Sequence, residues 1–137
     1  MSFSPKDPPD TVGTVVRIVA TDPAKIDESS SGIVWVLQGT DSEFLLAESA
    51  PGLTQSQLED LSYCHPEEVG CSTAGWSLID IGSPGSALLI DGTKVTLGAS
   101  ATSVTWLDRG VKFVVEGPVD SFSAADATSI AEQIVLA

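Results

Sequence analysis

The end of the chain carries apolar side chains at a spacing that suits a helix lying on another layer of structure. Residues of this kind recur every three or four positions: Ala127, Ile130, Ala131, Ile134 and Val135. The spacing predicts an amphipathic helix whose apolar stripe must be buried. Ser123 and Asp126, three positions apart, are typical of a capped, acidic helix start. The rest of the chain must therefore supply a surface for this stripe, and its sequence favours a β-sheet.

Short runs of β-branched and aromatic residues, separated by turn-forming residues, recur along most of the remaining chain. We predict strands at residues 11–20, 33–38, 43–48, 76–81, 87–90, 94–97, 103–107 and 111–116. Three connections favour hairpins: residues 39–42, the pair Asp91-Gly92 and residues 108–110. Asp91-Gly92 is the strongest local hairpin signal, and the length of 108–110 suits a bulged loop.

Apolar and polar residues alternate on both arms of the hairpin that spans residues 103–116. Val104 and Trp106 alternate with polar neighbours on the first arm, and Val111, Phe113 and Val115 do so on the second. Since successive side chains of a strand point to opposite faces, one face of this hairpin is predicted to be buried.

A second, short helix is predicted after residue 53. Thr54 and Gln57 form a capping-box pattern, and Leu53 and Leu58 are placed as a hydrophobic staple, so the helix should run to about residue 63. Residues 1–10 carry three prolines and are interpreted as a flexible tether. Residues 11–137 then form one α+β domain: an antiparallel sheet of short strands with the C-terminal helix on one face and a short second helix.

The charge of the chain excludes two classes of partner. Nineteen acidic and six basic residues give a net charge of −13, which repels nucleic acid and anionic membrane surfaces. Between Asp22 and Asp80 eleven acids accompany a single base, Lys25. This stretch is either a solvated face or a docking surface for a basic partner.

Two cysteines, Cys64 and Cys71, are separated by six residues that include Pro66 and Gly70. A turn can close this separation, so we predict a disulfide, worth about 2.5 kcal/mol in the chain-entropy model. Such a bond persists outside the reducing cytosol and predicts an extracytoplasmic protein. The alternatives are two inert thiols or a metal site.

A metal site would use the cysteines with His65 and Glu67 or Glu68, but the spacing matches no common zinc pattern, so no metal is expected. His65 is the sole histidine, and any mechanism that uses a histidine base depends on it. Neither a nucleophile elbow nor a phosphate loop occurs in the sequence. The acidic pairs Glu59-Asp60 and Glu67-Glu68 lie in polar segments, so we predict no enzymatic activity and no cofactor.

Three aromatic residues, Trp35, Trp106 and Phe113, lie within apolar or alternating strands. They are predicted to pack in the core. The alternative is that they line a ligand groove between the sheet and the terminal helix.

The final third of the chain contains a strand with Trp before a turn, a returning strand with an aromatic residue, and a helix with the pattern Ser…Ala…Ile-Ala. Its sequence is GTKVTLGASATSVTWLDRGVKFVVEG, followed by SFSAADATSIAEQI. This pattern resembles the C-terminal part of DUF4367-like extracytoplasmic domains of bacterial lipoproteins and anti-sigma-factor-like proteins. The matching residues are Gly92, Val104, Trp106, Gly110, Phe113, Ser123, Ile130 and Ala131. The resemblance implies an antiparallel sheet with a packed terminal helix, held outside the membrane.

The chain departs from that pattern because it has neither an anchor helix nor a cysteine near residue 2 that could carry a lipid. If the resemblance holds, an anchor preceded Ser2 or a different anchor is used. The leading hypothesis is a non-enzymatic extracytoplasmic module, membrane-tethered in its native setting, that binds a protein or a small ligand. The runner-up is a small secreted or periplasmic carrier of an apolar ligand, and the third class is a hydrolase that uses His65. The sequence leaves the partner and the oligomeric state open.

Overall fold

In the part of the chain that the structure describes, seven antiparallel strands form one sheet in the order β1-β2-β3-β7-β6-β5-β4. The structure is a computed structural model, and it describes residues 8–20, 32–39, 42–61, 75–95 and 100–136. The strands are β1 (Thr14–Ala20), β2 (Gly32–Gln38), β3 (Glu43–Ser49), β4 (Trp76–Asp80), β5 (Ser86–Ile90), β6 (Ala101–Asp108) and β7 (Val111–Pro118). The predicted α+β class is confirmed.

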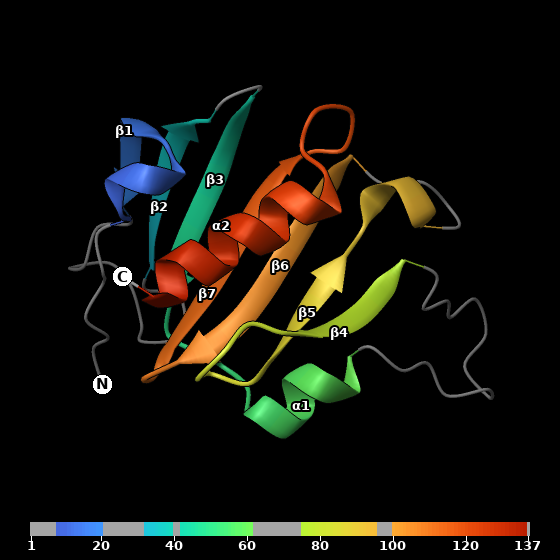
Figure 1. The fold of residues 1–137 in the computed structure, drawn as a ribbon. Coiled ribbons are helices and arrows are strands. Elements are labelled where there is room, and N and C mark those ends of the chain that lie inside the picture. Colours follow the sequence, from blue (N-terminus) through green and yellow to red (C-terminus); the bar gives the residue numbers. More distant parts are fainter. Residues whose placement is uncertain (1–7, 21–31, 40–41, 62–74, 96–99, 137) are drawn as a thin grey trace.

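The C-terminal helix α2 (Ala124–Leu136) lies across one face of the sheet (Figure 1). The predicted capping box is present: the Ser123 hydroxyl accepts from the Asp126 backbone N–H, and the Asp126 carboxylate accepts from the Ser123 N–H, both at 3.1 Å. Of the apolar stripe, Ala127, Ala131 and Ile134 are buried, while the other two residues are half-buried and pack against the core. The predicted helix and its buried stripe are therefore confirmed.

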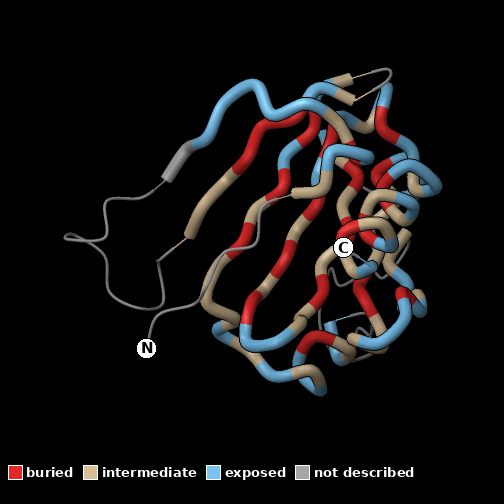
Figure 2. The backbone as a smooth tube through the Cα atoms, turned by 60° about the vertical axis from the view of Figure 1, so that its left-hand side comes forward, coloured by how far each residue is buried: buried red, intermediate tan, exposed pale blue. Residues whose placement is uncertain are grey.

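The core lies between α2 and the sheet. On β6 and β7 the buried side chains alternate along the chain, as the sequence pattern predicts. The buried apolar residues of this cluster are Val12, Trp35, Leu37, Phe44, Leu46, Ile81, Ala87, Val104, Trp106, Val111, Phe113, Val115, Phe122, Ala127, Ala131 and Ile134. In Figure 2 the buried segments run down the central strands and along the inner side of α2.

The short helix α1 (Gln55–Asp60) covers part of the opposite face. Leu58 is fully buried there, and Leu88 of β5 is buried beside it at 4% exposure. Leu88 points away from α2, because its neighbour Ala87 points toward α2. Gln55 Nε2 donates to the Ser86 carbonyl at 2.9 Å and ties α1 to β5. The capping box of Thr54 is confirmed. The helix ends at Asp60, short of the predicted end near residue 63, and residues 62–74 lie outside the described part of the chain.

The first strand begins later than predicted. Residues 11–20 were expected to form one strand, but Asp10–Val12 form a 3₁₀ turn, η1, in which the Val12 N–H donates to the Pro9 carbonyl at 3.2 Å. This turn places Val12 in the core at 6% exposure, and Gly13 then leads into β1 with a φ of 151°. Val12 is buried by contact with α2, which is distant in sequence. The strand propensity of residues 11–13 does not include this contact, so the sequence predicted the strand start too early.

The hairpin predicted at Asp91-Gly92 is wrong. Asp91 instead caps a second 3₁₀ turn, η2 (Gly92–Lys94), and its carboxylate accepts from the Thr93 N–H at 3.0 Å and the Thr93 hydroxyl at 2.6 Å. Lys94 therefore lies in a turn and not in the strand predicted at 94–97, of which residues 96 and 97 lie outside the described part. The next strand, β6, starts at Ala101 and pairs with β5 (Ile90↔Ser103).

The hairpin between β6 and β7 is confirmed, but its loop is shorter than predicted. Asp108 pairs with Val111, which leaves a two-residue loop of Arg109 and Gly110 with φ values of 51° and 78°. Positive φ at both central positions is the pattern of a type I′ turn, whose twist matches that of the flanking strands. A bulged three-residue loop is therefore not formed.

Candidate functional site

The three aromatic residues considered for a ligand groove lie in the core. Trp35, Trp106 and Phe113 are 4%, 0% and 3% exposed, and none of them lines either of the two hollows described below. Trp106 and Phe113 face each other across β6 and β7 and stack with ring centroids 5.0 Å apart and planes 5° apart. Their geometry is that of a packed aromatic pair.

The residues behind the disulfide, metal and hydrolase hypotheses cannot be placed in this fold. Cys64, His65, Glu67, Glu68 and Cys71 all lie in residues 62–74, outside the described part of the chain. These hypotheses therefore stay predictions.

The first structural feature suited to recognition is strand β1, which is an edge of the described sheet. Val15, Val16 and Ile18 of this strand are 41%, 51% and 58% exposed. No acidic residue occurs in Thr14–Ala20, and Arg17 at its centre is the only charge. Figure 2 shows exposed residues running along β1 at the margin of the sheet. A long edge strand with branched apolar side chains is a template for pairing with another strand.

The opposite edge, β4, is less suited to pairing. It is five residues long, against seven for β1, and exposes Leu78 at 41%, with the acidic residue Asp80 two positions further on the same face. Asp80 also accepts from the Gly82 N–H at 2.9 Å, which fixes its carboxylate in the turn to β5. The two edges of the sheet thus differ in length, charge and apolar exposure. A substitution on β4 can therefore serve as the control for the same substitution on β1.

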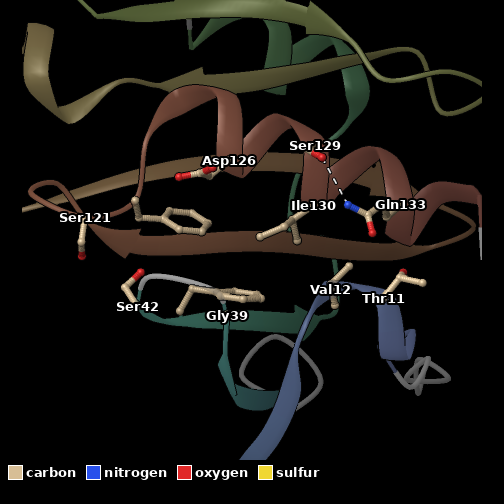
Figure 3. Close-up of a pocket in the computed structure, with 11 residues that line it drawn as sticks. Thr11, Val12, Gly39, Ser42, Ser121, Asp126, Ser129, Ile130 and Gln133 are labelled. Carbon is tan, nitrogen blue, oxygen red and sulfur yellow. Dashed lines mark hydrogen bonds between the residues drawn. The ribbon is translucent and has the colours of Figure 1, made fainter.

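The second feature is a groove beside α2, which we call the α2 groove (Figure 3). It has a volume of about 160 Å³ and is lined by Thr11, Val12, Gly39, Ser42, Phe44, Ser121, Phe122, Asp126, Ser129, Ile130 and Gln133. Figure 3 shows Asp126, Ser129, Ile130 and Gln133 along the helix wall, with Thr11 and Val12 facing them from η1. Apolar side chains therefore meet polar ones along one groove.

The third feature is a hollow on the sheet face away from α2, which we call the outer pocket. It has a volume of about 290 Å³ and is lined by Arg17, Val36, Glu43, Phe44, Leu45, Ser100, Ala101, Glu116, Gly117 and Pro118. Val36 and Leu45 are paired in the β2–β3 register and form its apolar base. One cation and two carboxylates flank this base, so the pocket carries charge of both signs.

Among the described residues, Asp91 has a clearly shifted pKa, and its carboxyl group lies in a turn. The hydroxyl of Thr93 hydrogen-bonds to the Asp91 carboxylate and holds the pKa of that group below its ordinary value, aided by the Thr93 N–H and Lys94 and opposed by partial burial. Asp91 lines neither hollow. Within the described residues, no three His, Cys, Asp or Glu side chains are grouped so that they could hold a metal ion. No helix of the described part is long and apolar enough to cross a membrane.

Sequence reasoning missed the exposure of β1, and the groove that it considered between the sheet and the terminal helix was assigned to other residues than those that line the α2 groove. One signal for the groove was present in the sequence: Asp126, Ser129 and Gln133 recur at spacings of three and four beside the apolar stripe, so they share one side of the helix. The facing wall comes from η1 and from the connection between β2 and β3, which lie far away in sequence. No sequence signal for the edge position of β1 was present.

Comparison of the chain with protein-family models, with curated proteins and with solved structures finds no match. The function must therefore be argued from these three surfaces.

Proposed function

We propose that this chain is a non-enzymatic protein-binding module of the cell envelope, membrane-tethered in its native setting, that binds an extended segment of a basic partner protein along β1. The observation that carries the proposal is the apolar exposure of this edge strand, with Val16 and Ile18 each more than half exposed. Among the described strands, β1 pairs only with β2, so no described strand pairs with the other side of its backbone.

The chemistry of an open edge determines what binds there. The unpaired N–H and C=O groups of an edge bind water or another extended backbone, and on β1 the stretch from Arg17 to Ala20, beyond the register shift at Val16, offers them in a regular ladder. Exposed apolar side chains on the edge add cross-strand contacts with the incoming strand, each worth roughly 0.2–1 kcal/mol. An extended polypeptide is therefore the ligand that this surface fits best.

Charge argues that the partner is a different protein and not a second copy. Each copy carries a net charge of −13, so two copies repel each other and a basic partner is attracted. Arg17 is the middle residue of Thr14–Ala20, so symmetric antiparallel pairing of two β1 strands would place the two Arg17 side chains opposite each other. A partner strand with an apolar centre and flanking basic residues avoids both costs.

A synthetic peptide tests this proposal. A short peptide of alternating valine and threonine, flanked by lysines, should bind with a Kd of roughly 0.1–1 mM and shift the backbone amide signals of residues 14–20 in ¹H–¹⁵N spectra. Ile18→Lys places a charge at the most exposed apolar position of β1 and should weaken binding by at least about tenfold. Because Ile18 is 58% exposed, this variant should remain folded.

The matched control is Leu78→Lys on the opposite edge, which should leave peptide binding unchanged. A peptide of the same composition interrupted by proline should not bind, because proline removes ladder N–H groups. The proposal is wrong if the amide shifts concentrate on β4, or if Ile18→Lys and Leu78→Lys weaken binding equally. Sedimentation that shows a β1-dependent dimer without peptide would identify a second copy as the partner.

The proposed envelope location rests on the predicted Cys64–Cys71 bond and on the resemblance of residues 92–134 to extracytoplasmic domains. After expression in an oxidising compartment, intact mass with and without alkylation of the unfolded chain should show no free thiol. Detection of two free thiols would remove the main argument for this location. It would leave the β1 proposal untouched, since β1 does not depend on the bond.

A carrier of an apolar ligand is the second candidate, and the outer pocket is the observation that favours it. Its base of Val36 and Leu45 is apolar, and its volume of about 290 Å³ exceeds that of the α2 groove. Native mass spectrometry of the purified protein would reveal a retained lipid if the chain were such a carrier. Arg17, Glu43 and Glu116 beside the base make it a less suitable site for a purely apolar molecule.

A further inference from the structure

The α2 groove combines an apolar base with a polar rim. Val12, Phe44 and Phe122 at its base are 6%, 2% and 3% exposed, and the two phenyl rings stack with centroids 5.4 Å apart. The rim carries the side chains of Thr11, Ser42, Ser121, Asp126, Ser129 and Gln133. A few polar groups around an apolar base are what orients a small amphipathic ligand in a pocket.

The volume of the groove limits the ligand. At about 160 Å³, it is close to the roughly 150 Å³ of a cavity that takes one benzene molecule. It is far smaller than the roughly 300–1,000 Å³ of sites for larger ligands. A single six-membered ring, or a short branched chain of similar size, is therefore the body that it can hold.

Charge then selects among ligands of this size. Among the described residues, Asp126 is the only ionisable one that lines the groove, and the Ser123 N–H holds one of its oxygens at 3.1 Å. The Asp126 N–H at the start of α2 is itself bonded to the Ser123 hydroxyl, and the carboxylate offsets the positive end of the helix. The groove therefore favours a cation, and the net charge of −13 acts in the same direction.

A metal ion does not fit this arrangement, because a single carboxylate with neutral hydroxyls and an amide is a weak donor set. An organic cation uses the whole surface: its ammonium group faces Asp126 and the hydroxyls, and its body lies on the apolar base. We infer that the α2 groove is a binding site for a small organic ammonium ion with a body about the size of benzene.

Benzylamine, benzyl alcohol and benzoate test this inference, because they share a ring and differ in charge at neutral pH. Benzylamine should bind with a Kd of about 1 mM and shift the amide signals of Gly39, Ser121 and Ser129 and the side-chain amide of Gln133. Benzyl alcohol should bind about tenfold more weakly, and benzoate should not bind at the same concentrations.

Two variants locate the site, and a third is their control. Asp126→Asn keeps an acceptor for the Ser123 N–H and should reduce benzylamine binding to the level of benzyl alcohol, about tenfold weaker. Ser129→Leu should fill the groove and abolish binding of both ligands, with no loss of helix propensity. Glu132→Gln removes the same charge from an exposed position of α2 outside the groove and should change binding by less than about twofold at physiological salt.

Three results would overturn the inference. Binding of benzoate as tight as that of benzylamine would show that Asp126 does not set the charge preference. Equal losses in Asp126→Asn and Glu132→Gln would show a non-local charge effect. Amide shifts outside the groove, unchanged in Ser129→Leu, would place the ligand elsewhere. None of these results bears on peptide binding at β1, so the two proposals are tested separately.

Discussion

Replacement of Trp106 by alanine should lower the free energy of unfolding by about 3–5 kcal/mol, the range for truncation of a buried large aromatic side chain. Trp106 is fully buried on β6, an interior strand of the sheet, on the face that α2 covers, and it stacks on Phe113. Truncation leaves a cavity next to β6. Because β6 is hydrogen-bonded to β7 on one side and to β5 on the other, the backbone cannot shift to fill the cavity. Urea unfolding followed by circular dichroism measures this loss.

Trp76 provides the matched control, since it is the same residue type on edge strand β4 and is only half-buried. Trp76→Ala should cost less than half as much as Trp106→Ala. Trp106→Phe should also cost less than Trp106→Ala, because it keeps an aromatic ring and removes an indole N–H that has no hydrogen-bond partner among the described residues. Equal losses at positions 76 and 106 would contradict the described core.

Introduction of a methyl group at Gly117 should destabilise the protein by about 1–3 kcal/mol or more, because the new Cβ would overlap the ring of Phe122. Gly117 is buried on β7, on the face that α2 covers, and Phe122, near the end of the connection from β7 to α2, packs back over it. The ring is held in turn by its stack with Phe44, so it cannot simply rotate away. Thermal and urea unfolding of Gly117→Ala measure the cost.

A double-mutant cycle separates this clash from other causes. Phe122→Ala alone should cost about 3–5 kcal/mol. In that background Gly117→Ala should cost less than in the wild-type protein, because the ring is gone and only the Cβ of residue 122, 2.7 Å from the new Cβ, still opposes it. Gly52→Ala measures the opposite case, a backbone penalty without a clash, because its Cβ would meet no atom within 4 Å and its φ of 66° is left-handed, unlike the φ of Gly117. Additive losses in the Gly117–Phe122 cycle would show that the two residues do not touch.

Features that follow from local sequence were predicted correctly. The stripe of α2 and the alternation around Trp106 and Phe113 are each determined by the period of one element, 3.6 residues for a helix and two for a strand. The capping boxes of α1 and α2 were also predicted, since they need only residues three positions apart. A closing helix on a sheet followed from these patterns without knowledge of the strand order.

Features that depend on distant residues were not predicted. Asp91-Gly92 has the composition of a hairpin turn, but glycine is required there because a side chain at Gly92 would overlap the carbonyl of Ala101 at the start of β6. The sequence of β1 has the same branched apolar composition as a buried strand, and only the strand order makes it an edge. The α2 groove needs η1 and the β2–β3 connection beside α2, an arrangement that no local pattern contains.

Recognition of an extended chain by strand β1 is tested most directly by isotope-filtered NOE measurements on the labelled protein with the unlabelled valine–threonine peptide. We expect cross-strand NOEs between the peptide backbone and the backbone of Arg17 and Ile18, in the regular pattern of an added strand. Intermolecular NOEs that involve only α2 or β4, or none at saturating peptide, would contradict the account.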